Sequence, residues 1–172
     1  MPTLPWIISV LETTPERWTR LVETLPAELL NRPPAAGEWS ALECLHHLLS
    51  TEAVNATRLQ AFLAGQPSFP AYDPDAPENR PDPTLGPLEL AREFARRRAA
   101  SLTALRLLTA ADLGRGSRHA GLGPVTLDQL LHNWAAHDLN HTVQAERALM
   151  QPFLAGCGPW IEYYASHLVK TP

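Results

Sequence analysis

The stretch HNWAAHDLNHTVQAE, residues His132–Glu146, decides how this chain is interpreted. It holds His137 and His141, which are four residues apart. In an α-helix four residues turn through about 400°, so the two imidazoles would differ by only about 40° around the helix axis. Two nitrogen ligands on one helix face are a common beginning of a transition-metal site, although two ligands alone do not make one. The stretch therefore predicts a helix with two candidate ligands, and another element has to supply the third.

The helix that contains this stretch has a well-marked beginning. Thr126 and Gln129 have the spacing of a capping box, in which each residue satisfies a backbone N–H of the other. From there we expect the helix to run to about Met150. Glycines and a proline follow, and a short last helix is expected over residues 159–170.

Apolar residues at helical spacing predict two further long helices. One covers residues 4–30 and is kinked or restarted at Pro15. The other covers residues 85–109 and carries five arginines. We interpret these arginines mainly as a solvated surface paired with acids. The alternative is a clamp for an anionic substrate, because Arg92 and Arg96 share a helix face.

One more helix is expected within residues 37–65. It begins with a second capping box, formed by Ser40 and Glu43. Trp39 comes just before this box, at the position of a hydrophobic staple, where an apolar side chain packs against the first turn of the helix. We expect both Trp39 and Trp134 to pack in the hydrophobic core.

The remaining segments read as connections. Residues 66–87 are rich in proline and predict a long irregular loop, and residues 110–125 predict a glycine-rich connector without phosphate-loop spacing. No segment shows convincing strand alternation. Four amphipathic helices in a chain of 172 residues predict one all-α domain, residues 1–172, built as a four-helix bundle with a short C-terminal helix.

Bundle interiors hold metal ions with side chains from facing helices, so the third ligand is expected from another helix. His46 and His47 are the candidates in the helix within residues 37–65. Adjacent helical residues differ by about 100°, so only one of the two can face the pair on the other helix. Both border the apolar side of the helix, and spacing alone does not choose between them.

The segments WSALECLHHL, residues 39–48, and HDLNHTVQ, residues 137–144, occur here in this order. Together they resemble the DinB/YfiT family of metal-binding four-helix bundles. The resemblance extends to the proline-rich crossover, the arginine-containing helix, and the G-x-x-T turn at residues 123–126. It covers most of the chain.

The resemblance implies a ligand set and a fold. In that family the ligand from the second helix lies eight residues after the tryptophan, which is His47 here, and the other two match His137 and His141. It implies a divalent ion, most often nickel or zinc, with water in the open positions. It also implies an up-down-down-up bundle and a homodimer. Some members are S-transferases that use the thiols bacillithiol or mycothiol, some act on other substrates, and many have no known activity.

Three more residues are candidates near the site. Gln144 is three residues after His141 and shares its face, so it could line a pocket or orient a ligand. His119 precedes the last long helix and could reach the pocket mouth. Asp138 stands where the related zinc-protease motif HExxH has its catalytic glutamate, but an aspartate is shorter. We prefer for Asp138 a supporting or solvent-exposed role, with a catalytic base as the minority interpretation.

Composition narrows the class of protein. The net charge of −4 disfavours nucleic acid as a partner, and no apolar run is long enough for a bilayer span. The N-terminus lacks a basic leader, and two cysteines are too few for a disulfide scaffold, so we expect a cytoplasmic location.

Three neutral ligands would leave an ion with open positions, as in catalytic zinc sites. We therefore expect a metal-dependent enzyme acting on a small-molecule substrate, either a thiol S-transferase with a low-molecular-weight thiol as co-substrate or a hydrolase. The alternative is a non-catalytic metal-binding or stress-response module in which the metal is structural.

Overall fold

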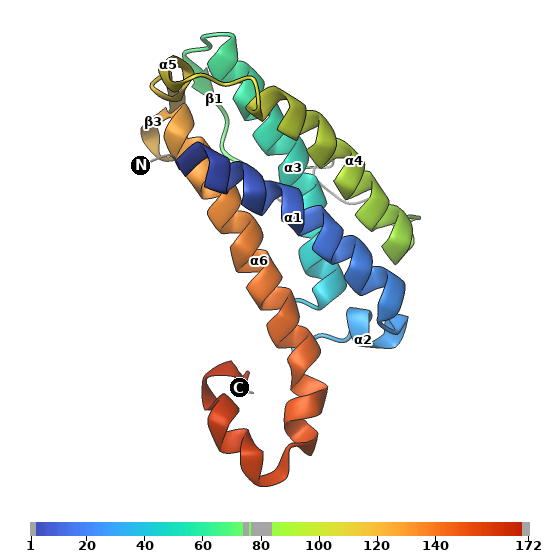
Figure 1. Ribbon diagram of the computed structural model, residues 1–172. Helices are drawn as coiled ribbons and strands as arrows, with labels where there is room; N and C mark the ends of the chain where they lie inside the picture. Colours follow the sequence, from blue (N-terminus) through green and yellow to red (C-terminus); the bar gives the residue numbers. More distant parts are fainter. Residues whose placement is uncertain (1–2, 74–75, 77–83, 170–172) are drawn as a thin grey trace.

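Four long helices pack side by side in the computed structural model, which describes residues 3–73, 76 and 84–169. They are α1 (Thr3–Thr24), α3 (Ala41–Leu63), α4 (Pro87–Leu105) and α6 (Leu127–Gly156). Helices α1 and α3 each pack against both α4 and α6, which makes the arrangement a four-helix bundle (Figure 1). The colours in Figure 1 run one way along α1 and α6 and the other way along α3 and α4. The predicted mainly helical bundle is confirmed.

The first predicted helix is shorter than expected. Helix α1 ends at Thr24, and residues 27–31 form a separate short helix, α2 (Ala27–Asn31), after Pro26. At Pro15 the helix continues without a restart. This is feasible because the proline ring holds φ near the helical value and removes only one backbone hydrogen bond.

The C-terminal part differs from the prediction in length and type. Helix α6 passes through Pro152 and ends at Gly156, beyond the expected end at Met150. The last helix, η2 (Gly158–His167), is a 3₁₀-helix, and the predicted end at Lys170 lies outside the described residues. Figure 1 shows that α6 extends past the other three long helices and that η2 lies beside its far end.

A small sheet at one end of the bundle corrects the expectation that the chain has no strands. It consists of β1 (Ser68–Phe69), β2 (Gly116–His119) and β3 (Gly123–Thr126). Strand β2 pairs in parallel with β1 and in antiparallel fashion with β3. The predicted connector 110–125 also contains a short helix, α5 (Ala110–Leu113). Strands of two to four residues are too short for alternation to be seen in the sequence.

Both predicted capping boxes are present. The Ser40 hydroxyl accepts from the backbone N–H of Glu43 at 3.2 Å, and the Glu43 carboxylate accepts from the Ser40 N–H at 2.7 Å. Thr126 and Gln129 make the same reciprocal pair at 3.2 and 2.9 Å. Each box stabilises its helix by about 1 kcal/mol, and together they set where α3 and α6 begin.

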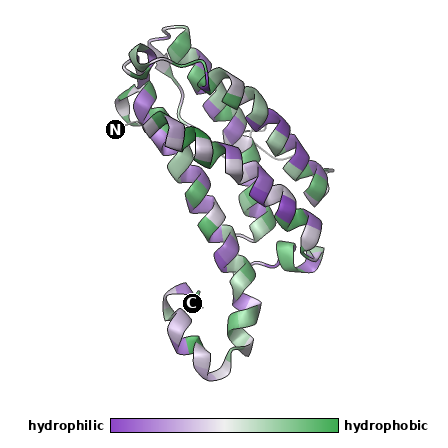
Figure 2. Cartoon of the chain, in the orientation of Figure 1, coloured by the Kyte–Doolittle hydropathy of each residue, from purple (hydrophilic) through white to green (hydrophobic). Residues whose placement is uncertain are grey.

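Apolar side chains fill the space between the long helices. Figure 2 shows hydrophobic and hydrophilic residues interspersed along each of them, as amphipathic helices require. Trp134 is 1% exposed and lies in the core as predicted, with Leu11, Phe62 and Leu131 in the same cluster. No helix among the described residues is both long and apolar enough to cross a membrane.

Candidate metal centre

Three histidines from two facing helices meet inside the bundle. His47 comes from α3, and His137 and His141 come from successive turns of α6. One ring nitrogen from each lies within 4.8 Å of the other two. The Nε2 atoms of His47 and His137 are 3.1 Å apart. The structure therefore brings together the three histidines that the family resemblance singled out.

The register of α3 separates His47 from its neighbour. Leu45 and Leu48 are buried in the core, and His47 projects toward α6. His46 instead lines a different cavity of about 610 Å³, which it shares with Glu43 and residues 35–40. The two adjacent histidines thus serve different faces, as the 100° step between them requires.

The surroundings favour neutral imidazoles. Burial and, to a lesser extent, the nearby ring of His141 lower the pKa of His47 and of His137 to about 4. Burial also lowers the pKa of His141, against the hydrogen bond that the ring donates to Gln144 and the charge of Asp138, which raise it. Neutral imidazole is the form that ligates a metal ion. All three rings are therefore in the ligating state at neutral pH.

Gln144 orients one of the rings. Its side-chain oxygen Oε1 lies 2.8 Å from Nδ1 of His141, one turn earlier on α6. An amide oxygen only accepts, so the ring proton of neutral His141 is on Nδ1 and the Nε2 lone pair is free to ligate. Gln144 is the residue that we expected from the sequence to line the pocket or orient a ligand, and in the structure it contacts His141.

Two aromatic side chains border the cluster. Trp39 stacks on His141 with ring centroids 5.7 Å apart, and its ring lies 5.0 Å from that of His47. Tyr72 approaches His47 edge-on at 5.9 Å, and its hydroxyl lies 2.9 Å from the hydroxyl of Ser50. The expectation that Trp39 is a core residue is wrong, because its side chain is 38% exposed. It borders the site, in which His47 and His137 are partly exposed and His141 is buried.

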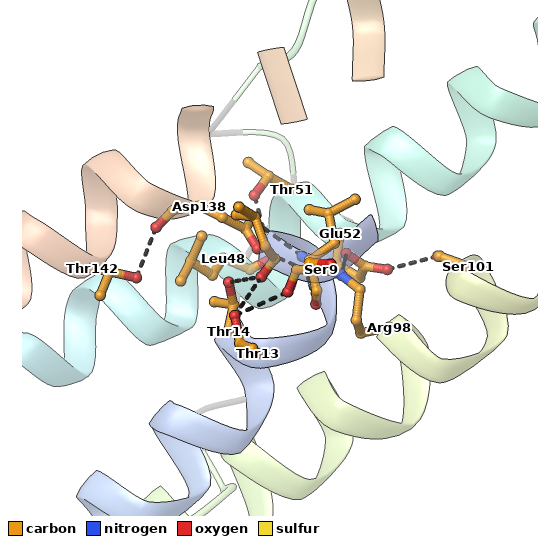
Figure 3. Close-up of polar contacts among 12 residues, drawn as sticks. Ser9, Thr13, Thr14, Leu48, Thr51, Glu52, Arg98, Ser101, Asp138 and Thr142 are labelled. Atoms are coloured by element: carbon orange, nitrogen blue, oxygen red, sulfur yellow. Dashed lines mark hydrogen bonds and ion pairs between the residues drawn. The ribbon is translucent and has the colours of Figure 1, made fainter. Parts of the chain in front are cut away.

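Behind the histidines lies a buried ionic network, shown in Figure 3. Arg98 of α4 donates to both oxygens of Asp138, at 2.6 and 3.1 Å, and from Nε to Glu52 at 2.8 Å. Its Nη1 also donates to the Leu11 carbonyl at 2.8 Å. Ser101 donates to the other oxygen of Glu52 at 2.6 Å. These contacts join α1, α3, α4 and α6 at one level of the bundle.

This network corrects two sequence-based interpretations. Asp138 is 1% exposed, so a solvent-exposed position is wrong, and both of its oxygens are occupied by Arg98. Arg98 is fully buried and does not belong to a solvated surface. Its spacing was the missed signal, since it lies four residues after Phe94 and four before Leu102, both core positions. Glu52 has the same relation to Leu48.

The remaining arginines of α4 and the remaining histidines lie elsewhere. Arg96 and Arg97 pair with Glu93 at the surface, as the solvated-surface interpretation expects. His132 and His167 are exposed. His119 lies on β2 and lines a separate pocket, away from the three-histidine cluster.

A four-helix bundle with three histidines between two of its helices defines a class of candidate metal-binding proteins. The family model of the DinB superfamily matches residues 10–145. The chain therefore belongs to the DinB superfamily, as the sequence resemblance indicated. A comparison with curated proteins found no match.

Two solved structures have a similar fold. YfiT from Bacillus subtilis, described as a probable metal-dependent hydrolase with an unusual four-helix bundle topology, superposes with a TM-score of 0.74 at 21% identity, covering 87% of each chain. A DinB-like protein from Bacillus subtilis superposes with a TM-score of 0.61 at 19% identity, covering 86% of this chain and 92% of its own. At these identities the comparison establishes the shared fold.

Proposed function

We propose that His47, His137 and His141 hold a divalent metal ion, nickel or zinc, and that the chain is a metal-dependent enzyme. The observation that carries this proposal is the convergence of three ring nitrogens within 4.8 Å, from helices that meet only in the folded chain. The description of YfiT as a probable metal-dependent hydrolase supports it by analogy.

The residues fit such an ion. Metal–nitrogen bonds of about 2.0–2.1 Å place neighbouring ligand nitrogens roughly 3.0–3.4 Å apart. The 3.1 Å between His47 and His137 lies in this range. All three nitrogens lie within 4.8 Å of one another, and rotation of the imidazole rings about their side-chain bonds can bring them closer. The three rings are also neutral, as ligation requires. Because Gln144 accepts the proton on Nδ1 of His141, the lone pair on Nε2 of that ring is free to ligate the ion.

An ion held by three neutral ligands has open positions and would supply Lewis acidity, lowering the pKa of a water molecule or thiol that binds it. The protein's own residues prepare this chemistry. Gln144 orients His141, and Trp39 and Tyr72 form an aromatic wall against which a substrate can pack. We assign Asp138 a positioning role, because Arg98 occupies both of its oxygens and fixes the turn of α6 next to His137.

Hydrolysis and thiol S-transfer are the two reactions that we propose for this site, the second with a low-molecular-weight thiol as co-substrate. Both need a nucleophile activated near neutral pH. The partial exposure of His47 and His137 supports a catalytic rather than a closed structural site, because small molecules can then approach the ligands.

The first experiment is elemental analysis of protein purified without an affinity tag or added metal. We expect about one nickel or zinc ion per chain, and a metal-free protein that takes up neither ion would contradict the proposal. The second is a screen of the metal-loaded protein with ester substrates, and with thiols paired with electrophiles. A variant with His141→Ala serves as the matched control, and equal rates for both proteins would argue against catalysis at this site.

We also propose an up-down-down-up topology and a homodimer. The chain directions visible in Figure 1 support the topology. Exposed apolar side chains support the dimer. Leu139 and Val143 share a face of α6, and Phe153 near the end of α6 and Trp160 on η2 are exposed as well. Light scattering at micromolar concentration tests the dimer, and a monomer mass would contradict it.

A further inference from the structure

A separate pocket lies where the small sheet meets α3 and α6. Its volume is about 260 Å³, and its walls come from α3, β1, β2, the β2–β3 turn, β3 and the beginning of α6. On α6 its lining reaches Asn133, one turn or about 6 Å before His137. On α3 it contains Arg58, about 16 Å along the axis from His47. The pocket and the histidines therefore share the α3–α6 face of the bundle.

Arg58 is a half-buried cation without a carboxylate partner among the described residues. Its guanidinium lies over the Phe69 ring, 5.3 Å from the centroid. Its polar contacts are long, at 3.4 Å to the Pro70 carbonyl and 3.4 Å to Nε2 of His119. Burial lowers the pKa of Arg58. A charge removed from water without a counter-ion is costly, and an anionic ligand would offset that cost.

His119 presents a second donor at the same point. Its Nδ1 accepts hydrogen bonds from the backbone N–H groups of Gly121 and Leu122, at 3.0 and 3.2 Å. Burial and the charge of Arg58 lower the pKa of His119, so the ring is neutral and its one proton is on Nε2. Nε2–H of His119 and the Nη2–H of Arg58 therefore face one another at 3.4 Å, with no acceptor between them among the described residues. An oxygen anion placed there would accept from both residues.

The rest of the pocket is apolar. Its hydrophobic lining consists of Phe69, Leu122, Pro124, Val125 and Leu130. The volume is below the roughly 300–1,000 Å³ of sites for drug-sized ligands, which indicates a small occupant. One guanidinium matches the single charge and planar shape of a carboxylate, whereas a phosphate dianion calls for more donors.

We propose that this pocket, the Arg58 pocket, binds the carboxylate of a small amphipathic acid whose other end reaches toward the histidines and is the substrate of that site. The substrate assignment rests on the proposed function, and the binding of the acid does not. Arg58 and His119 hold the carboxylate, the apolar lining holds the body of the acid, and the remainder passes Asn133, which lies one turn before His137 on α6.

Calorimetric titration of the metal-free protein tests the pocket. Phenylacetate should bind, and its neutral analogue 2-phenylethanol should bind at least tenfold more weakly. Arg58→Gln removes the charge but keeps a polar side chain, and it should weaken phenylacetate binding by about tenfold or more. Arg118→Gln is the matched control, because Arg118 is the neighbour of His119 on β2 with its side chain on the other face. It should bind phenylacetate as the wild type does.

Several results would overturn the pocket. These are no binding of phenylacetate, equal binding of 2-phenylethanol, no loss in Arg58→Gln, or an equal loss in Arg118→Gln. Inorganic phosphate binding more tightly than phenylacetate, with the same dependence on Arg58, would overturn the carboxylate assignment. Circular dichroism checks that Arg58→Gln is folded. If it is not, Arg58→Lys is used, which keeps the charge, loses the planar fork, and should bind phenylacetate severalfold more weakly.

A second measurement separates this inference from the proposed function. In protein loaded with paramagnetic Co²⁺, the NMR signals of 6-phenylhexanoate should broaden, and Arg58→Gln should abolish the broadening. Binding without broadening would overturn the link to the histidine site and leave the Arg58 pocket standing. A protein that takes up no Co²⁺ would count against the proposed metal function, while the calorimetric result would still decide the pocket.

Discussion

Arg98 donates a hydrogen bond to the carbonyl of Leu11, which is the carbonyl that Pro15 leaves without its helical donor. In an uninterrupted helix the N–H of residue 15 would bond to the carbonyl of residue 11, and proline has no N–H. A side chain from α4 thus completes the backbone hydrogen bonding of α1. The same guanidinium forms ion pairs with both Glu52 and Asp138. Pro15 and Arg98 are therefore coupled features, and the interruption in α1 serves the ionic network.

The first prediction concerns this network. Arg98→Ala should destabilise the protein by about 3–5 kcal/mol, because it leaves Glu52 and Asp138 buried without a cation. Urea unfolding measures the loss. Arg96→Ala is the control on the same helix, since Arg96 pairs with Glu93 in solvent and its loss should leave the free energy of unfolding nearly unchanged. Similar losses in the two variants would show that the buried network contributes no more to the free energy of unfolding than a surface ion pair does.

The second prediction distinguishes the two adjacent histidines of α3. His47→Ala should remove stoichiometric metal, because His47 faces His137 and His141. His46→Ala should retain metal, because His46 lines a different cavity. Elemental analysis of the two purified variants gives the comparison. Retention in the first and loss in the second would reverse the assignment.

The third prediction concerns the orientation of His141. Gln144→Leu should lower metal affinity by about 10–100-fold, the usual effect of losing a partner that holds a ligating imidazole. Competition with a coloured chelator measures the affinity. Gln151→Leu is the matched control on α6, since Gln151 bonds to the backbone at Arg147 and His167 instead. An affinity equal to wild type in Gln144→Leu would remove Gln144 from the site.

The fourth prediction concerns removal of the metal. The capping boxes and the apolar core should allow the chelated protein to keep its helical circular dichroism. Metal at a hundredfold excess over its dissociation constant should add about 3 kcal/mol, so the melting temperature should fall by several degrees on chelation. A chelated protein that is unfolded at room temperature would show that the metal is structural. A melting temperature indifferent to both chelator and His141→Ala would show that no metal binds.

The fifth prediction concerns the pH dependence of the chelated protein. The pKa of His47 and of His137 is about 4 in the folded state, below the value of about 6.5 for free histidine. Between these values the unfolded chain binds more protons, so stability is fully present above pH 6.5 and is lost as the pH falls toward 4. Urea unfolding from pH 7 to 4 measures this decline. A double variant, His47→Gln with His137→Gln, should decline less steeply, and an unchanged slope would contradict the assigned cause.

Proton competition acts in the same direction on the metal. As the pH falls toward 4, His47 and His137 of the folded, metal-free protein take up protons, and each proton must leave before the nitrogen can ligate, so metal affinity falls. The difference in melting temperature between the metal-loaded and chelated protein should therefore close in acid.

The sequence predicted the bundle because each long helix is indicated by signals within its own residues. Capping boxes at Ser40 and Thr126 mark where two of the helices begin, and apolar spacing marks their buried faces. It also predicted the pair His137 and His141, since four residues on a helix determine a shared face. The choice of His47 over His46 needed the family resemblance. The step of about 100° between adjacent helical residues shows that the two side chains point in different directions, but only the position of α6 shows which of them faces His137 and His141.

The rest depends on contacts between distant parts of the chain. Trp39 was expected in the core from its position beside a helix start, but the structure places it against His141, 102 positions away in the sequence. The strands are too short to show alternation and exist because β2 pairs with both β1 and β3. Arg98 follows directly after surface arginines in the sequence, and only its spacing of four residues from Phe94 and from Leu102 indicated that it is buried. Pairing partners of this kind cannot be derived from local periodicity.

The separation of the candidate ligands has a kinetic consequence. His47 and His137 are 90 positions apart, so their rings can meet only after a long loop closes and α6 docks on α3. Closing a loop of this length costs conformational entropy before the contacts that it allows can form. Contacts of this kind therefore generally form late in folding. A metal ion held there would stabilise the native state more than the transition state. It would prolong the lifetime of the folded chain while leaving the rate of folding almost as it was.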